Sequence, residues 1–107
     1  MSFTVVTTAE QFAALTTNPK APALIMFGSP GCPYCVKGKP ILREFATKYP
    51  RMAVAFVDVD RYEVLAGTFR ISNLPTYIVF AEGKRKKRAS GMHEFDDLVD
   101  LLEKALK

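Results

Sequence analysis

The sequence predicts an α/β domain with a mixed sheet of four or five strands and helices on both faces, in the order β-α-β-α-β-α-β-β-α. Two mainly apolar runs of strand length, Ala23–Phe27 and Met52–Val59, fit central strands covered on both faces. Helical patterns separate and follow these runs, and a hairpin signal stands near the C-terminal end. Strands alternating with helices pair in parallel through right-handed crossovers, and a hairpin adds antiparallel strands.

The first elements are a short strand and a helix. Phe3–Val6 is rich in β-branched residues, which are typical of a strand. A Thr-Thr pair then stands three residues ahead of a Glu-Gln pair, which is the spacing of a capping box and predicts a helix over Ala9–Thr16. Pro19 ends this helix, because the residue before a proline is pushed out of the helical region.

The middle of the chain predicts two further helices. Small and turn-forming residues follow the first apolar run, and from Pro33 to Tyr49 apolar residues recur at three- and four-residue steps, as on one face of a helix. A short helix over Tyr62–Thr68 is expected after the second apolar strand.

The last elements are a hairpin and an amphipathic helix. Thr76–Ala81 and Lys84–Ala89 flank Glu82-Gly83, which predicts two antiparallel strands joined by a tight turn. In the final helix one face is apolar and the remaining positions are mostly acidic; the apolar residues are Phe95, Leu98, Val99, Leu102 and Leu106.

Length and composition favour one domain over residues 1–107. The chain is 49% hydrophobic and 24% charged, which is the balance of an ordinary globular protein. Its apolar runs fall far short of the roughly 20 residues that a transmembrane helix needs, so we expect no membrane role. The first ten residues lack the basic and apolar regions of a signal peptide, which predicts a cytoplasmic protein.

The net charge of +4 comes from one segment. Lys84–Arg88 holds five of the fifteen basic residues, which leaves ten against eleven acidic residues elsewhere. As an outermost strand it would point Lys84, Lys86 and Arg88 to one side and the other two residues to the opposite side, so that one side lies over the acidic last helix; lysines there discourage edge pairing. The alternative is a nuclear-localisation or nucleic-acid patch. Nucleic acid is disfavoured, because aromatic residues do not interleave the run.

Cys32 and Cys35 enclose a Pro-Tyr dipeptide where a buried strand gives way to a helix. Unpaired N–H groups and the positive end of the helix dipole would stabilise a thiolate on Cys32, and a thiolate is the species that attacks a disulfide. Cys35, one turn later, could then displace the mixed disulfide. Lys37 and Lys39 add positive charge nearby, and Pro33 suits a first helical turn.

Two other roles for these cysteines stay open at this stage. Two thiolates and the single histidine, His93, cannot fill a tetrahedral zinc site within one chain, so we expect no metal site of that kind. A zinc or iron–sulfur site shared between two chains, or two inert thiols, is the alternative to redox chemistry. His93 itself is interpreted as a solvated residue at a helix start, and the absence of a second histidine disfavours a cysteine hydrolase.

Pro75 stands at the mouth of a predicted strand, in Asn73-Leu74-Pro75-Thr76. A proline there adopts either the cis form, which exposes the preceding backbone, or the ordinary trans form. The residues alone do not decide between the two.

Together these features resemble the thioredoxin family over essentially the full chain. The resemblance rests on the apolar strand before Cys32, the Cys-x-x-Cys pair, Pro40 in the following helix, and residues spaced as in the family: Ala66, Phe69, Ile71, Leu74, Pro75, Thr76, Gly83 and Gly91. It implies a thioredoxin fold, with Cys32 as exposed nucleophile, Cys35 as buried resolving thiol and a cis Pro75 beside them. It also implies a substrate-binding surface of Pro33, Tyr34, Leu74, Pro75 and Gly91.

The chain departs from the family pattern around the cysteines. Gly31 replaces a tryptophan, and Pro33-Tyr34 is the dipeptide typical of dithiol glutaredoxins. Met26 stands where thioredoxins have a buried aspartate, and Phe56 stands where they have the lysine that pairs with it. Losing both partners leaves neither unsatisfied, but it removes a general base.

The resemblance therefore implies a monomeric thiol–disulfide oxidoreductase that reduces protein disulfides and binds no cofactor. Its reducing equivalents would come from NADPH through a thioredoxin reductase, or from glutathione. The alternatives are a glutathione-dependent, glutaredoxin-like reductase, an iron–sulfur carrier that uses Cys32 from two chains, and an adaptor that binds through Lys84–Arg88.

Overall fold

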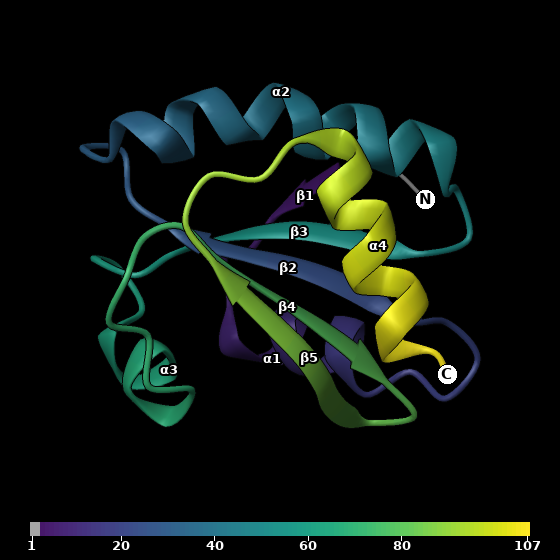
Figure 1. Ribbon diagram of the computed structural model, residues 1–107. Helices are drawn as coiled ribbons and strands as arrows, with labels where there is room; N and C mark the ends of the chain where they lie inside the picture. Colours follow the sequence, from purple (N-terminus) through teal and green to yellow (C-terminus); the bar gives the residue numbers. More distant parts are fainter. Residues whose placement is uncertain (1–2) are drawn as a thin grey trace.

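The computed structural model describes residues 3–107 and shows a mixed sheet with helices on both faces, as the sequence predicts (Figure 1). Residues 1–2 lie outside the described residues. They belong to the first ten residues, in which the sequence shows no signal-peptide pattern. The strands are β1 (Phe3–Val5), β2 (Ala23–Gly28), β3 (Ala53–Asp58), β4 (Thr76–Ala81) and β5 (Lys84–Ser90). The helices are α1 (Ala9–Thr16), α2 (Pro33–Lys48), α3 (Glu63–Thr68) and α4 (Phe95–Ala105).

The five strands lie in the order β1-β3-β2-β4-β5. The central strand β2 is buried along its whole length; it pairs in parallel with β3 and antiparallel with β4. Because β2 and β4 run in opposite directions, the end of β2 and the start of β4 meet at one edge of the sheet. Phe27 pairs with Thr76 at that edge, so the loop after β2 lies beside the segment that enters β4.

Alternating side chains of the sheet feed two core clusters, one on each face. Leu24 and Met26 of β2 pack on the side of α2 and α4, whereas Ile25 and Phe27 pack on the side of α1 and α3. Figure 1 shows α2 and α4 together over one face of the sheet. Continuous apolar strands are what this two-sided burial requires.

Local signals explain why several elements begin where the sequence predicts. The Thr8 hydroxyl accepts the Gln11 backbone N–H at 3.0 Å and caps α1. Glu94 and Asp97 form a reciprocal capping box that starts α4. Between β4 and β5, Glu82 and Gly83 both adopt positive φ, 56° and 75°, as a tight two-residue hairpin turn requires.

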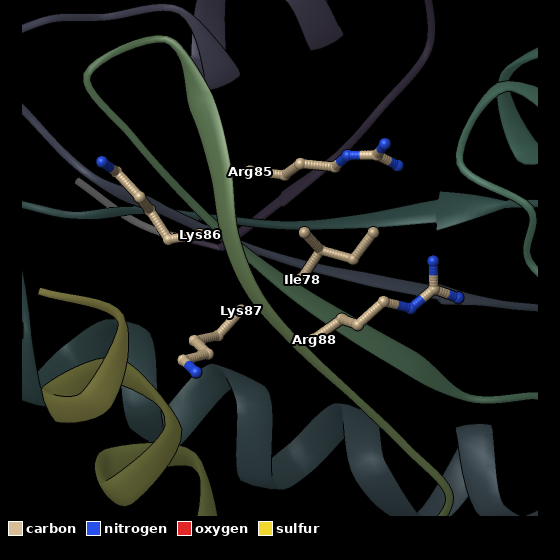
Figure 2. Close-up of a pocket in the computed structure, with 5 residues that line it drawn as sticks. All are labelled: Ile78, Arg85, Lys86, Lys87 and Arg88. Atoms are coloured by element: carbon tan, nitrogen blue, oxygen red, sulfur yellow. The ribbon is translucent and has the colours of Figure 1, made fainter.

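The side-chain alternation predicted for the basic strand β5 is wrong. Val79 pairs with Lys87 but Phe80 pairs with Arg85, so Lys86 is an extra residue that forms a β-bulge. One inserted residue reverses the alternation beyond it. Arg85 and Arg88, predicted to point to opposite sides, therefore lie on the same side as Ile78 and line one shallow hollow with it (Figure 2).

Arg88 holds a neighbouring loop. Its guanidinium donates hydrogen bonds to the backbone oxygens of Phe69 at 2.6 Å and Arg70 at 3.3 Å. The Arg85 guanidinium lies 5.7 Å from the centre of the Phe69 ring. These contacts show a structural role for part of the basic run: it fastens the end of α3 to the sheet.

Candidate active site

Cys32 is the N-cap of α2, and Pro33 occupies the first turn of this helix. The Cys32 sulfur accepts the Cys35 backbone N–H at 3.2 Å. The Cys32 side chain is half-buried, and both cysteines are free thiols. The first cysteine therefore lies at the positive end of a sixteen-residue helix and keeps a path to solvent.

Cys35 lies one turn further into α2 and is fully buried. Burial, together with a hydrogen bond to Cys32, raises the pKa of the Cys35 thiol from 9.0 to about 12; a backbone hydrogen bond from Ser29 and the positive charge of Lys39 oppose this increase. Cys35 is therefore a neutral thiol at pH 7 when the pair is reduced.

The backbone at Gly28, where β2 ends, comes very close to the Cys35 sulfur. A Cβ atom at Gly28 would lie 2.7 Å from Cys35 Sγ and 3.0 Å from Cε1 of Phe56. A side chain at position 28 would displace the sulfur or the ring, so glycine is what lets the strand and the helix meet there.

Pro75 lies at the same edge of the sheet as the cysteine loop. The Leu74–Pro75 peptide bond is cis, as the resemblance implies. The Gly91 N–H donates a hydrogen bond to the Pro75 carbonyl at 2.8 Å, and Gly91 has a φ of 90°, which favours glycine. This hydrogen bond joins Pro75 and Gly91, which lie far apart in the sequence.

Thr76 and Ser90 also hold the segment that enters β4, although neither is predicted from the sequence as a site residue. The buried Thr76 hydroxyl donates to the Asn73 carbonyl at 2.6 Å and lies 3.1 Å from the Ser90 hydroxyl. Thr76 begins an apolar strand and Ser90 ends the basic one, so only their pairing across the hairpin shows the link.

The predicted substrate-binding residues differ in exposure. Pro33 and Tyr34 are exposed beside Cys32, and Leu74 is half-buried against the core cluster that includes Cys35. Their role in binding a substrate stays a prediction. Of the two lysines predicted near the pair, Lys37 lies 5.9 Å from the centre of the Tyr34 ring.

The centre of the sheet beneath the pair is apolar. Met26 and Phe56 are buried, and they pair with each other across β2 and β3. The Lys39 ammonium of α2 lies 4.1 Å from the centre of the Phe56 ring, so a positive charge reaches this region from the helix. Met26 and Phe56 occupy the two strand positions at which the family pattern has an aspartate and a lysine, so neither position supplies a carboxylate.

His93 lies directly before the N-cap of α4, as predicted, but its ring is not simply solvated. Its side chain is half-buried, its Nε2 atom lies 3.0 Å from the Ser90 carbonyl, and its ring packs at 5.8 Å against the buried ring of Tyr77. The loop before α4 folds back over the sheet and carries the histidine with it. A single sequence gives no sign of this contact.

Residues 3–107 contain no group of three or more His, Cys, Asp or Glu side chains placed to hold a metal ion. Over the same residues, no helix has the length and apolar character needed to cross a membrane.

A family model described as Thioredoxin matches residues 3–104. The chain belongs to the thioredoxin family. It is 34% identical over 101 residues to thioredoxin Y2, chloroplastic, of Arabidopsis thaliana, a match that covers 94% of this chain and 60% of that protein. It is 32% identical over 81 residues to the thioredoxin of Chlamydia trachomatis, with 76% and 79% of the two chains covered. The chain thus spans under two thirds of the length of the plant relative.

Solved structures agree with this assignment. A mutant thioredoxin from Halobacterium salinarum NRC-1 superposes with a TM-score of 0.88 at 25% identity, covering 99% of this chain and 92% of that one. The thioredoxin fold predicted from the resemblance is confirmed. The two relatives named above are a chloroplastic and a bacterial thioredoxin.

Proposed function

We propose that this thioredoxin-family chain reduces protein disulfides by dithiol exchange, with Cys32 attacking and Cys35 resolving. The observation that carries the proposal is the contrast between the two sulfurs: Cys32 is half-buried at a helix N-terminus, whereas Cys35 is completely buried beneath it. Only Cys32 is open to a large substrate, and only Cys35 is placed to attack a disulfide formed on Cys32.

The substrate would dock on the surface around Cys32. The exposed Pro33 and Tyr34 on one side, and the half-buried Leu74 and Gly91 next to the buried cis Pro75 on the other, offer apolar side chains and backbone to an extended segment. We further propose that the chain works as a monomeric single domain in a reducing compartment such as the cytoplasm, where Cys32 and Cys35 are returned to thiols.

Two reductants fit the site, and NADPH through a thioredoxin reductase is the proposed one because the family assignment is to the thioredoxins. Glutathione is the second candidate, favoured by the exposed Pro33-Tyr34 dipeptide next to Cys32. In both cases the protein supplies the dithiol and binds no cofactor of its own.

The test supplies a protein disulfide with either NADPH and a thioredoxin reductase, or NADPH, glutathione and glutathione reductase, and follows NADPH consumption. We expect sustained turnover with the thioredoxin reductase system, and none with Cys32→Ser. Turnover with the glutathione system alone would establish the glutaredoxin-like alternative. Failure of both systems, with the chain folded and its thiols reduced, would refute the proposed function.

A further inference from the structure

Among residues 3–107, two buried tyrosine hydroxyls have no hydrogen-bond partner, those of Tyr62 and Tyr77. An unpaired buried hydroxyl lowers stability, and phenylalanine would fill the same space without that cost. Tyr77 belongs to β4 and is completely buried in the core cluster that also contains Cys35 and Met26. Tyr62 precedes α3 and packs against the cluster on the opposite face of the sheet.

The Tyr77 hydroxyl lies against α2 one turn beyond Cys35. A Cβ atom at Gly38 would be 2.7 Å from the Tyr77 hydroxyl oxygen and 3.1 Å from the Met26 Cε atom. The glycine therefore leaves the space that this hydroxyl and the Met26 methyl group occupy.

The sheet register places Tyr77 directly opposite Met26 on the neighbouring strand. Met26 offers no polar atom that can exchange a proton, whereas Tyr77, opposite it on the neighbouring strand, brings a hydroxyl into the core cluster that contains Cys35. Burial, the charges of Cys35 and Cys32 and that of Glu94 raise the pKa of Tyr77 to about 12. The hydroxyl is therefore a hydrogen-bond donor over the whole working range of pH.

Resting on the proposed function, we propose that Tyr77 is a positioning residue for the resolving step: its hydroxyl donates a hydrogen bond to the Cys35 sulfur, directly or through one water molecule, as that sulfur becomes a thiolate. A phenol that donates to a thiolate stabilises the charged form. The hydroxyl acts through Cys35 and does not touch the substrate.

The step balances with Tyr77 unchanged. Cys35 loses its proton to water, and its thiolate attacks the Cys32 sulfur of the mixed disulfide. The Cys32–Cys35 bond forms as the bond between Cys32 and the substrate sulfur breaks. The substrate leaves as a thiolate and takes up a proton from water, so the protein ends oxidised and the substrate reduced.

Several charged or titratable groups surround the two side chains. Cys32 and Lys39 act on Cys35 from α2, the first raising its pKa and the second lowering it. His93 packs on the Tyr77 ring, and Glu94 acts on its hydroxyl, both from the loop that leads into α4. All of these groups except Cys32 are present in every variant below. When two variants share the same background, a difference between them therefore reports the effect of the hydroxyl alone.

The experiment compares Tyr77→Phe with Tyr62→Phe, which removes the other unpaired hydroxyl on the far face of the sheet. In a Cys32→Ser background, the Cys35 ¹³Cβ resonance is followed against pH. We expect Tyr77→Phe to move the onset of Cys35 ionisation up by about 0.5 to 1 pH unit, the value of one hydrogen bond, and Tyr62→Phe to leave it in place. An unchanged titration in Tyr77→Phe would overturn the proposal.

Stopped-flow decay of the mixed disulfide in the chain with both cysteines gives the second readout. Tyr77→Phe should slow the decay by about threefold to tenfold below pH 8, and Tyr62→Phe should not change it. Equal slowing in both variants would mean a structural effect and would also overturn the proposal. The Cys35 titration needs no substrate, so a chain that fails to reduce protein disulfides would refute the proposed function without deciding the role of Tyr77.

Discussion

Cys32 and Cys35 differ in exposure although only two residues separate them. Helix geometry causes the difference: Cys32 caps the helix at the surface, and Cys35 turns inward against Gly28 and the core. The same geometry supports the two proposed roles, because the Cys32 sulfur is open to a substrate and the Cys35 sulfur is buried.

Serine substitutions test these roles separately. Cys32→Ser should abolish disulfide reduction, since no attacking thiolate is left. Cys35→Ser should accumulate a mixed disulfide between Cys32 and the substrate, because only the resolving step is lost. Mass spectrometry of the complex measures this. If Cys35→Ser kept full activity and Cys32→Ser merely slowed it, the assignment would be reversed.

Met26 is the clearest departure from the family at residue scale. Met26→Asp would place a carboxylate near the resolving thiol, where it accepts a proton, so the mixed disulfide should decay about tenfold faster or more near pH 7. The variant should lose about 3 kcal/mol of stability, because Phe56 cannot pair with a buried carboxylate. Met26→Asn is the matched control, being polar without being a base. Stopped-flow decay of the mixed disulfide and urea denaturation measure the two effects. Equal decay rates in Met26→Asp and the original chain would mean that the methionine only packs the core.

At the scale of elements, sequence patterns predict the helices and strands well but not how side chains meet between them. Thr8 and Gln11 cap α1 through a contact between near neighbours in the sequence, and the predicted range of this helix is the observed one. The bulge at Lys86 leaves no such sign, because five consecutive basic residues carry no apolar alternation from which to infer a register. Likewise, the contact of Tyr77 with Gly38 joins β4 to α2 and depends on the tertiary fold.

Arg88 provides a test at this scale, since it ties β5 to the end of α3 by two hydrogen bonds. Arg88→Met keeps the aliphatic stem and should lower the free energy of unfolding by about 1 to 2 kcal/mol. Lys87→Met, on the other side of the same exposed strand, should change it by less than about 0.5 kcal/mol. Urea denaturation compares the two; equal losses would show that strand charge, and not the bonds of Arg88, matters.

At the scale of the whole molecule, the buried thiol makes stability depend on pH. The fold raises the pKa of Cys35 from 9.0 to about 12, chiefly by burial. Above pH 9 the unfolded chain releases this proton while the folded chain retains it, so rising pH favours unfolding. The contribution is fully present below pH 9 and is lost as the pH rises toward 12. Tyr77, raised to about 12 from 10.0, acts in the same direction.

We therefore expect the reduced protein to lose stability as the pH rises above about 9, and Cys35→Ala to lose less over the same range. Denaturation midpoints at matched pH values measure this. A loss as steep in Cys35→Ala as in the unchanged protein would contradict the assigned pKa of Cys35.

The central claim is that one chain donates two electrons through Cys32 and Cys35. A single-turnover reaction between the fully reduced protein and a limiting amount of a protein disulfide, quenched by alkylation and mapped by mass spectrometry, tests it most directly. The account predicts one Cys32–Cys35 disulfide within one chain for each substrate disulfide reduced. Reduced substrate recovered while Cys35 is still a free thiol, or while Cys32 is joined to a second chain, would contradict it.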